Sequence, residues 1–168
     1  MTSPATAIYN ELSAIVADPL HASGLHDLVT GQVWNRRLVK PPSPGATTAA
    51  YDSVGRPLIS IVIPGYLSDV DDLGPQSRKA SISAMMSFPQ IWFYGQARDS
   101  DRTVLETLVW TVYELITGEL SEIEGPDGSS IGLRVIGRNG VDDEPAMENT
   151  IFDMLRLQAD GLWIPEGA

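Results

Sequence analysis

The chain has 168 residues, a formal net charge of −11 at pH 7, and no cysteine. The acidic balance argues against a protein that binds nucleic acid by neutralising phosphates, because that mode of binding needs a basic face. The absence of cysteine excludes a disulfide framework, a thiolate nucleophile and cysteine-ligated zinc, and this size and composition predict a single domain over 1–168.

The first segment predicts an amphipathic helix. Ser3 is a favourable N-cap, Pro4 suits the first helical position, and Pro19 follows the expected end. The segment lacks the basic and apolar regions of a signal peptide, and no apolar run approaches the ~20 residues that span a bilayer. We therefore expect a soluble, intracellular protein without a membrane partner. The apolar positions of this helix are Ile8, Leu12, Ile15 and Val16.

Strands are expected in the following part of the chain. A short strand over 32–35 is the first of them. The β-branched run 58–63, opened by Pro57, is typical of a central strand that is buried on both faces. The segment 81–94 contains Pro89, which cannot donate a ladder hydrogen bond, so we expect a bent or interrupted strand there. The Pro-rich and Gly-rich stretches 40–56, 64–80 and 119–130 are expected to be long loops.

The strongest periodic signal predicts a long amphipathic helix over 100–118. Asp99 and Ser100 are candidate N-caps, and Gly118 is placed for the left-handed conformation that often follows a last helical turn. Burying the apolar stripe contributes about 10–20 kcal/mol before ordering entropy is subtracted, so a sheet or a second helix must cover it. The stripe consists of Val104, Leu105, Leu108, Val109, Val112, Leu115 and Ile116.

The last third of the chain contains a strand that ends near Asn139 and an ambiguous segment, 147–163. That segment has apolar residues at helical spacing and also at even, strand-like offsets. We favour a strand because the preceding strand needs a partner. The expected fold is thus α/β of the α+β type, with a single mixed or antiparallel β-sheet packed by the N-terminal helix and one long central helix.

Catalytic and metal-binding motifs are weak. Ser130 lies in a G-x-S-x-G pattern, but a nucleophile elbow needs a strand before the serine and a helix after it, and here the order is reversed. The acidic run that begins at Asp69 lacks the ligands that a calcium loop requires. We therefore expect no enzyme, no metal and no cofactor, and we keep a small serine hydrolase using Ser130 as a remote alternative.

Two polar clusters are candidates for protein contacts. Trp34, Arg36 and Arg37 form a compact basic and aromatic group, a combination enriched at interface hot spots. The alternative, which we favour about two to one, is a tryptophan at the edge of the core beside two solvated arginines. The acidic counterpart is Asp69, Asp71 and Asp72.

The order of elements resembles the tail terminator (tail completion) proteins of long-tailed bacteriophages. The matching stretches are the proline followed by an apolar strand, Arg56–Val62, and the Asp-rich entry to a helix, Ala97–Asp101. The resemblance covers about Pro4 to Ile164 as a pattern of elements. Two features depart from it: the long 40–52 loop and Pro89 within the second strand.

The resemblance implies a structural protein of the virion, assembled in the host cytoplasm. It implies a ring of identical subunits, usually six, at the head-proximal end of the tail tube, which stops tube polymerisation and joins tail to head. The implied partners are the major tail tube protein and a neck, stopper or head-completion protein, and DNA passes through without specific binding. Another connector or stopper protein of the neck is the nearest alternative. In such a ring, we expect charge reversal of Arg36 and Arg37 to leave the monomer folded but to weaken ring formation or tube capping, and reversal of the three aspartates to restore it in part.

Overall fold

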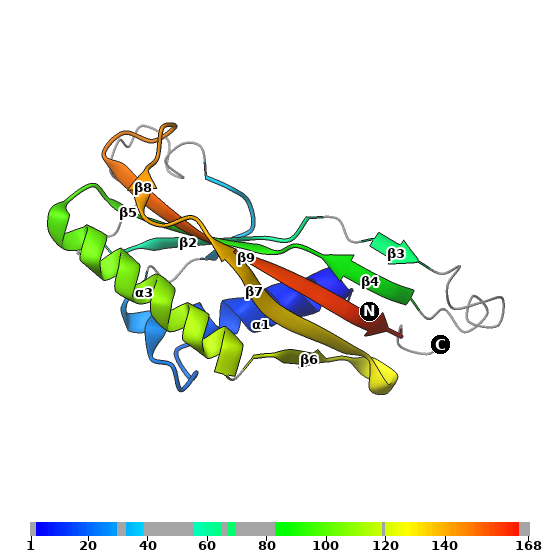
Figure 1. Cartoon of the computed structure of the whole chain (residues 1–168). Coiled ribbons are helices and arrows are strands. Elements are labelled where there is room, and N and C mark those ends of the chain that lie inside the picture. Colours follow the sequence, from blue (N-terminus) through cyan, green and yellow to red (C-terminus); the bar gives the residue numbers. More distant parts are fainter. Residues whose placement is uncertain are drawn as a thin grey trace.

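The computed structural model describes residues 3–29, 33–38, 56–64, 67–69, 83–118 and 120–164. Over these residues the chain forms two α-helices and one mixed sheet of nine strands (Figure 1). The predicted α+β class is therefore confirmed. The elements are α1 (Pro4–Ala17), β1 (Val33–Trp34), β2 (Leu58–Val62), β3 (Leu67–Asp69), β4 (Ser83–Ser87), β5 (Gln90–Gln96), α3 (Asp99–Gly118), β6 (Glu122–Glu124), β7 (Ser130–Arg138), β8 (Asp142–Asp143) and β9 (Thr150–Trp163), with short 3₁₀ turns at Leu25–Asp27 and Pro126–Gly128.

The sheet is built around β9, so the ambiguous segment 147–163 is indeed a strand. Along one edge of β9, β5 and β4 pair antiparallel with it, end to end. Along the other edge, β7 and β8 do the same. A side chain at Gly161 would collide with the backbone of Ser130, so glycine is what permits the close approach of β7 and β9 there.

β4 and β5 also belong to a long two-stranded hairpin. The outgoing side is β2 followed by β3, and the returning side is β4 followed by β5. Pro89 separates β4 from β5, which confirms the predicted interruption, and the Pro89 carbonyl still accepts a 2.8 Å hydrogen bond from the Leu157 amide. The short β1 pairs parallel with β2, and this pair alone makes the sheet mixed. In Figure 1, β3 and β4 lie at the end of the sheet opposite α3.

Alternation along the strands divides the sheet into two faces. On β5, Ile91 and Phe93 belong to the main core with both helices, whereas Trp92 and Tyr94 belong to a second, smaller cluster. We call the first the helix face and the second the back face. Figure 1 shows α1 and α3 on the same side of the sheet.

The two helices follow their predicted stripes with three differences. In α1 the Ser3 hydroxyl accepts from the Thr6 amide at 3.1 Å, as an N-cap should. In α3, Val104 does not belong to the buried stripe. It lies at the edge of the stripe and is 49% exposed, whereas the next residue, Leu105, is fully buried. The helix begins at Asp99 rather than at Ser100. Gly118 is the last helical residue and does not adopt a positive φ, so the expected left-handed C′ position was wrong.

The predicted loops contain short strands in their described parts. Glu122–Glu124 pairs with β7, so 119–130 is not loop throughout, and Leu67–Asp69 in 64–80 pairs with β4. Three-residue strands carry too little periodicity to be seen in a sequence. Of the loop 40–56, only Arg56 lies within the described residues. No helix in the described ranges is both long and apolar enough to cross a membrane.

Candidate assembly surface

Within the described residues, the back face of the sheet is covered over one half and open over the other. The covered half lies around Trp92, which stacks on Phe152 with 5.5 Å between ring centroids and on Tyr94 with 6.3 Å. The segments 33–38 and 144–149 cross this half and supply its cover. Its buried residues are Leu38, Leu58, Trp92, Tyr94 and Met147, with Trp34, Val62, Phe152 and Met154 packed at the margin.

The predicted basic and aromatic cluster lies at the margin of this half. The Arg36 guanidinium carbon is 5.8 Å from the centre of the Trp34 ring, and that of Arg37 is 4.5 Å from the Trp92 ring. Both arginines are exposed, and Trp34 is half-buried. Stacking of this kind contributes about 0.5–1 kcal/mol at an exposed site. Trp34 thus lies at the edge of the core, as expected if the cluster were not a contact site. The two arginines, however, lie over aromatic rings and are not simply solvated.

Arg37 has a second role that the sequence did not indicate. Its Nη2 lies 3.8 Å from Oε2 of Glu144, whose side chain is completely buried. Oε1 of Glu144 accepts from the Ala146 amide at 3.1 Å, but Oε2 has no hydrogen-bond partner within the described structure. Since a buried carboxylate without its countercharge is costly, Arg37 is needed for the fold itself. Arg36 is consequently the arginine of this cluster that is available for contacts with another molecule.

Tyr94 is the polar group at the centre of the covered half. Its hydroxyl oxygen accepts from the Leu38 amide at 3.1 Å and so fastens the covering segment to the sheet. Burial raises the pKa of Tyr94 from 10.0 to about 12, since the phenolate would be desolvated.

The Tyr94 pKa predicts a loss of stability at high pH. Because the folded state holds the Tyr94 proton more tightly than the unfolded state, the contribution is fully present below pH 10 and is lost as the pH rises towards 12. The slope is at most about 1.4 kcal/mol per pH unit. Urea unfolding of the native chain and of Tyr94→Phe, measured between pH 9 and 12, isolates the contribution of the Tyr94 proton to the unfolding free energy. The difference in unfolding free energy between the two should shrink over that range, and a constant difference would contradict the assignment.

The acidic cluster is largely outside the described residues. Asp69 ends β3 and pairs in register with Ala84, while Asp71 and Asp72 are not described. Because β3 and β4 lie at the end of the hairpin, Asp69 is remote along the chain and along the sheet from β1. The structure therefore does not bring the two predicted clusters together within one subunit, and their role as contacts stays a prediction.

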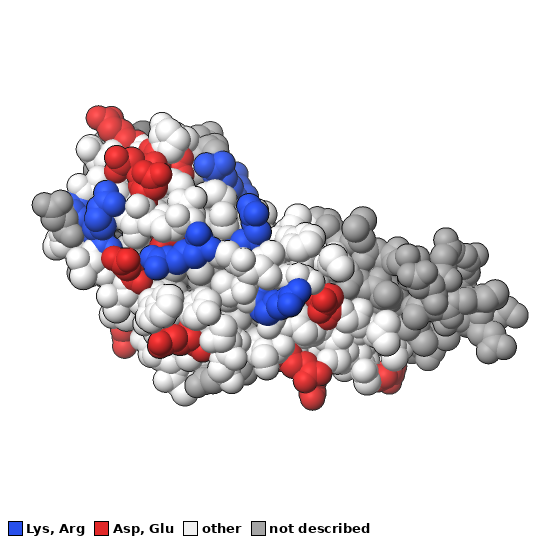
Figure 2. Space-filling model, viewed as in Figure 1, with Lys and Arg blue, Asp and Glu red and all other residues white. Residues whose placement is uncertain are grey.

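The open half of the back face carries both apolar and basic side chains. Met86, Phe88 and Leu162 are 40%, 42% and 45% exposed. Arg134 and Arg156 are exposed beside them, on β7 and β9. Figure 2 shows basic side chains in a band across the middle of the visible face, with acidic side chains mostly above and below it. The chain as a whole has a net charge of −11, but this part of its surface is locally positive and therefore favours an acidic partner surface.

A buried ionic network on the helix face escaped the sequence reasoning. The Asp153 side chain is completely buried and accepts from Arg138 Nε at 2.8 Å and Nη2 at 2.6 Å, and from the Gly140 amide at 2.9 Å. A bulge in β7 between Val135 and Gly137 shifts the alternation and so turns Arg138 towards this face. Arg138 Nη2 also lies 3.8 Å from Glu106 of α3. The network ties β7, β9 and α3 together.

Ser130 is not placed as a nucleophile elbow. It opens β7, pairs in register with Leu162, and its hydroxyl donates to Glu122 on the neighbouring β6. A serine nucleophile would also need a histidine as its base, and the two histidines of the sequence, His21 and His26, make local contacts after α1 with the Ser23 amide and with Asp27. Since a strand rather than a helix follows Ser130, the geometry gives the hydrolase alternative no support.

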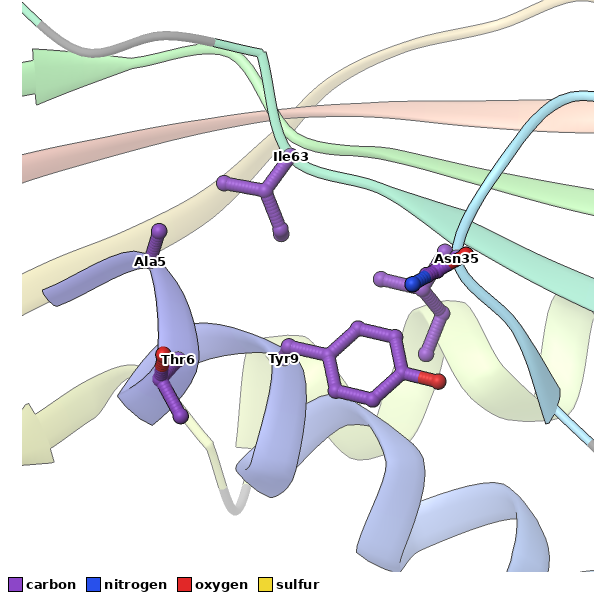
Figure 3. A pocket seen from close by; sticks show the side chains of 6 residues that line it. Ala5, Thr6, Tyr9, Asn35 and Ile63 are labelled. Atoms are coloured by element: carbon purple, nitrogen blue, oxygen red, sulfur yellow. The ribbon is translucent and has the colours of Figure 1, made fainter. Parts of the chain in front are cut away.

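A pocket of about 360 Å³ lies between the start of α1 and β2 (Figure 3). Its six lining residues are all uncharged, and the Tyr9 hydroxyl already donates to the Val33 carbonyl at 3.2 Å. The polar groups left to meet a ligand are those of Thr6 and Asn35, which are too few to define a reaction. The lining residues are Ala5, Thr6, Tyr9, Asn35, Ile61 and Ile63.

Comparison with known proteins adds no assignment. A scan against protein-family models finds no match, and neither does a comparison with curated proteins. The function must therefore be argued from the surfaces described above.

Proposed function

We propose that the protein is a structural ring component of a phage tail, a tail terminator at the head-tail junction of the virion. In this role, identical subunits, six in the expected ring, cap the tail tube, stop its polymerisation and bind a neck or stopper protein on the head side. DNA passes through the ring without specific binding. The order of elements that carries the resemblance is also the order in the described fold, which supports the proposal.

One observation carries the proposal: two differently built surfaces each expose large apolar side chains. On the back face these are Met86, Phe88 and Leu162, and on the helix side they are Leu28 and Val104, which line one groove beside α3. A closed ring needs two distinct, complementary surfaces on each subunit, whereas a two-fold dimer needs one self-complementary surface. Two such surfaces on opposite sides of the sheet are what repeated head-to-tail contact requires.

Reversal of a single charge tests the basic cluster. The Arg36→Glu variant should keep its fold, because Arg36 is exposed and stacked only on Trp34, but it should weaken ring formation or tube capping at least several-fold. The charge-preserving Arg36→Lys variant is the control and should assemble normally. Light scattering after size exclusion measures the assembly, and unchanged assembly of Arg36→Glu would remove the cluster from the interface.

Arg37 is unsuitable for the same test. A glutamate at this position would face the buried Glu144 and should destabilise the monomer, contrary to the sequence-based expectation that reversal at both arginines spares the fold. The rescue experiment is therefore best made on Arg36→Glu alone, by changing Asp69, Asp71 and Asp72 to arginine. Loss of assembly without rescue would refute this pairing and leave Arg36 with another partner.

A further inference from the structure

We propose that Phe88 of one copy of this chain inserts into a groove beside α3 of the next copy, so that the back face of one subunit meets the helix side of its neighbour. This inference rests on the ring assembly proposed above. It adds the two surfaces that meet and the side chain that anchors them.

The groove lies between the turn that ends at Leu28 and the flank of α3 that carries Val104, next to the buried stripe. It has a volume of about 260 Å³, enough to accept an aromatic side chain, and its lining residues are all uncharged. Leu28 is 54% exposed and Val104 is 49% exposed, so within the described part of the chain these side chains remain uncovered. A neutral, apolar groove of this kind is suited to an apolar anchor. Its lining consists of Leu28, Thr103, Val104, Thr107, Leu108 and Thr111.

Phe88 is built as an anchor. It lies at the break between β4 and β5, where the residue is 42% exposed, and the adjacent Pro89 is buried. The hydrogen bond from the Leu157 amide to the Pro89 carbonyl fixes the backbone at that point. A side chain on a fixed backbone loses less conformational entropy on binding than one on a mobile loop, which favours its use as a contact.

The charges around the two surfaces are complementary. Phe88 lies between Ser87, which pairs with Ala159, and Gln90, which pairs with Arg156, so Gln158 is its neighbour on β9. Gln158 accepts from Arg134 at 2.8 Å and donates to Asp160 at 3.1 Å. Among the described residues around Phe88, these two arginines against one aspartate give a net positive charge.

The rim of the groove is negative. Asp27 precedes Leu28 and its side chain is 78% exposed, and Glu114 is exposed one helical turn beyond Thr111. The positive surface around Phe88 therefore has a complementary surface, the groove, on the same molecule. Within one subunit Phe88 cannot reach the groove, because the sheet lies between the two. This geometry selects a second copy of the chain as the occupant.

Two variants that each remove one half of the contact test the inference. Phe88→Ser removes the anchor and leaves the groove intact. Thr107→Arg fills the groove and places a positive charge opposite Arg134 and Arg156, at an exposed helical position where arginine is well tolerated. Each variant alone should need at least tenfold higher concentration to assemble than the native chain. Mixed in equal amounts, they should form a dimer of one copy of each and stop there, because only one intact contact remains per pair.

The outcomes are distinguishable. Leu20→Ser is the control, since Leu20 is 92% exposed and belongs to neither surface, and it should assemble as the native chain does. If the native chain forms rings and both variants also do, or if the mixture stays monomeric, the inference is overturned and the ring proposal stands. If the native chain forms no ring at any concentration, with or without tail tubes, the proposed function itself fails.

Discussion

The Asp153→Ala variant should lose about 3 kcal/mol of unfolding free energy, among the largest single losses that the fold predicts. The substitution removes the acceptor of four hydrogen bonds, two from Arg138 and one each from the Gly140 and Met154 amides, and leaves Arg138 without its close partner. Breaking a buried ion pair costs about 3–5 kcal/mol, and the lower end applies because the Arg138 side chain is 26% exposed and can recruit water. Against a typical total of about 5–15 kcal/mol, the loss should be evident as a lower urea midpoint.

Two further variants identify the cause of that loss. Glu106→Gln is the matched control: Glu106 is 63% exposed and 3.8 Å from Arg138, so its removal should cost less than about 1 kcal/mol. The double variant Asp153→Leu with Arg138→Leu should recover part of the stability, because no unpaired charge remains. If Glu106→Gln is as damaging as Asp153→Ala, the network is centred on the helix and not on β9.

The Leu108→Asp variant should not fold. Leu108 is 3% exposed on the buried stripe of α3, and an unpaired carboxylate there costs several kcal/mol in addition to the packing that is lost. The matched control is Val104→Asp, one turn earlier on the same helix, where the side chain is 49% exposed and the change should cost about 1 kcal/mol or less. Circular dichroism separates the two. A folded Leu108→Asp variant would mean that the stripe does not face the sheet.

The sequence predicted most of the long elements because each has a local physical cause. Ser3 and Pro4 begin α1, the β-branched run after Pro57 becomes β2, and Pro89 interrupts the strand that contains it. Val104 was wrongly assigned to the buried stripe because the i, i+3, i+4 pattern shows which side of the helix is apolar but not how wide its buried part is. The edge of the buried face depends on where Leu28 and the sheet lie against α3, and the sequence alone does not give those positions.

The polar sites were less accessible to sequence reasoning. Asp153 could have been found, since it occupies the even-offset series of Ile151, Leu155 and Leu157, where an acid on a buried face requires a partner. The partner of Asp153 could not have been found from the sequence, because Arg138 faces that side of the sheet only as a result of the bulge in β7. The pairing of Arg37 with Glu144 likewise joins residues 107 positions apart, and no local pattern indicates such a contact.

The most direct test of the central claim is electron microscopy of the purified chain with and without its tail tube protein. The account predicts rings of the chain alone, and tubes with one such ring at a single end that no longer elongate. A chain that remains monomeric at every salt concentration, beside tubes that grow uncapped, would contradict it.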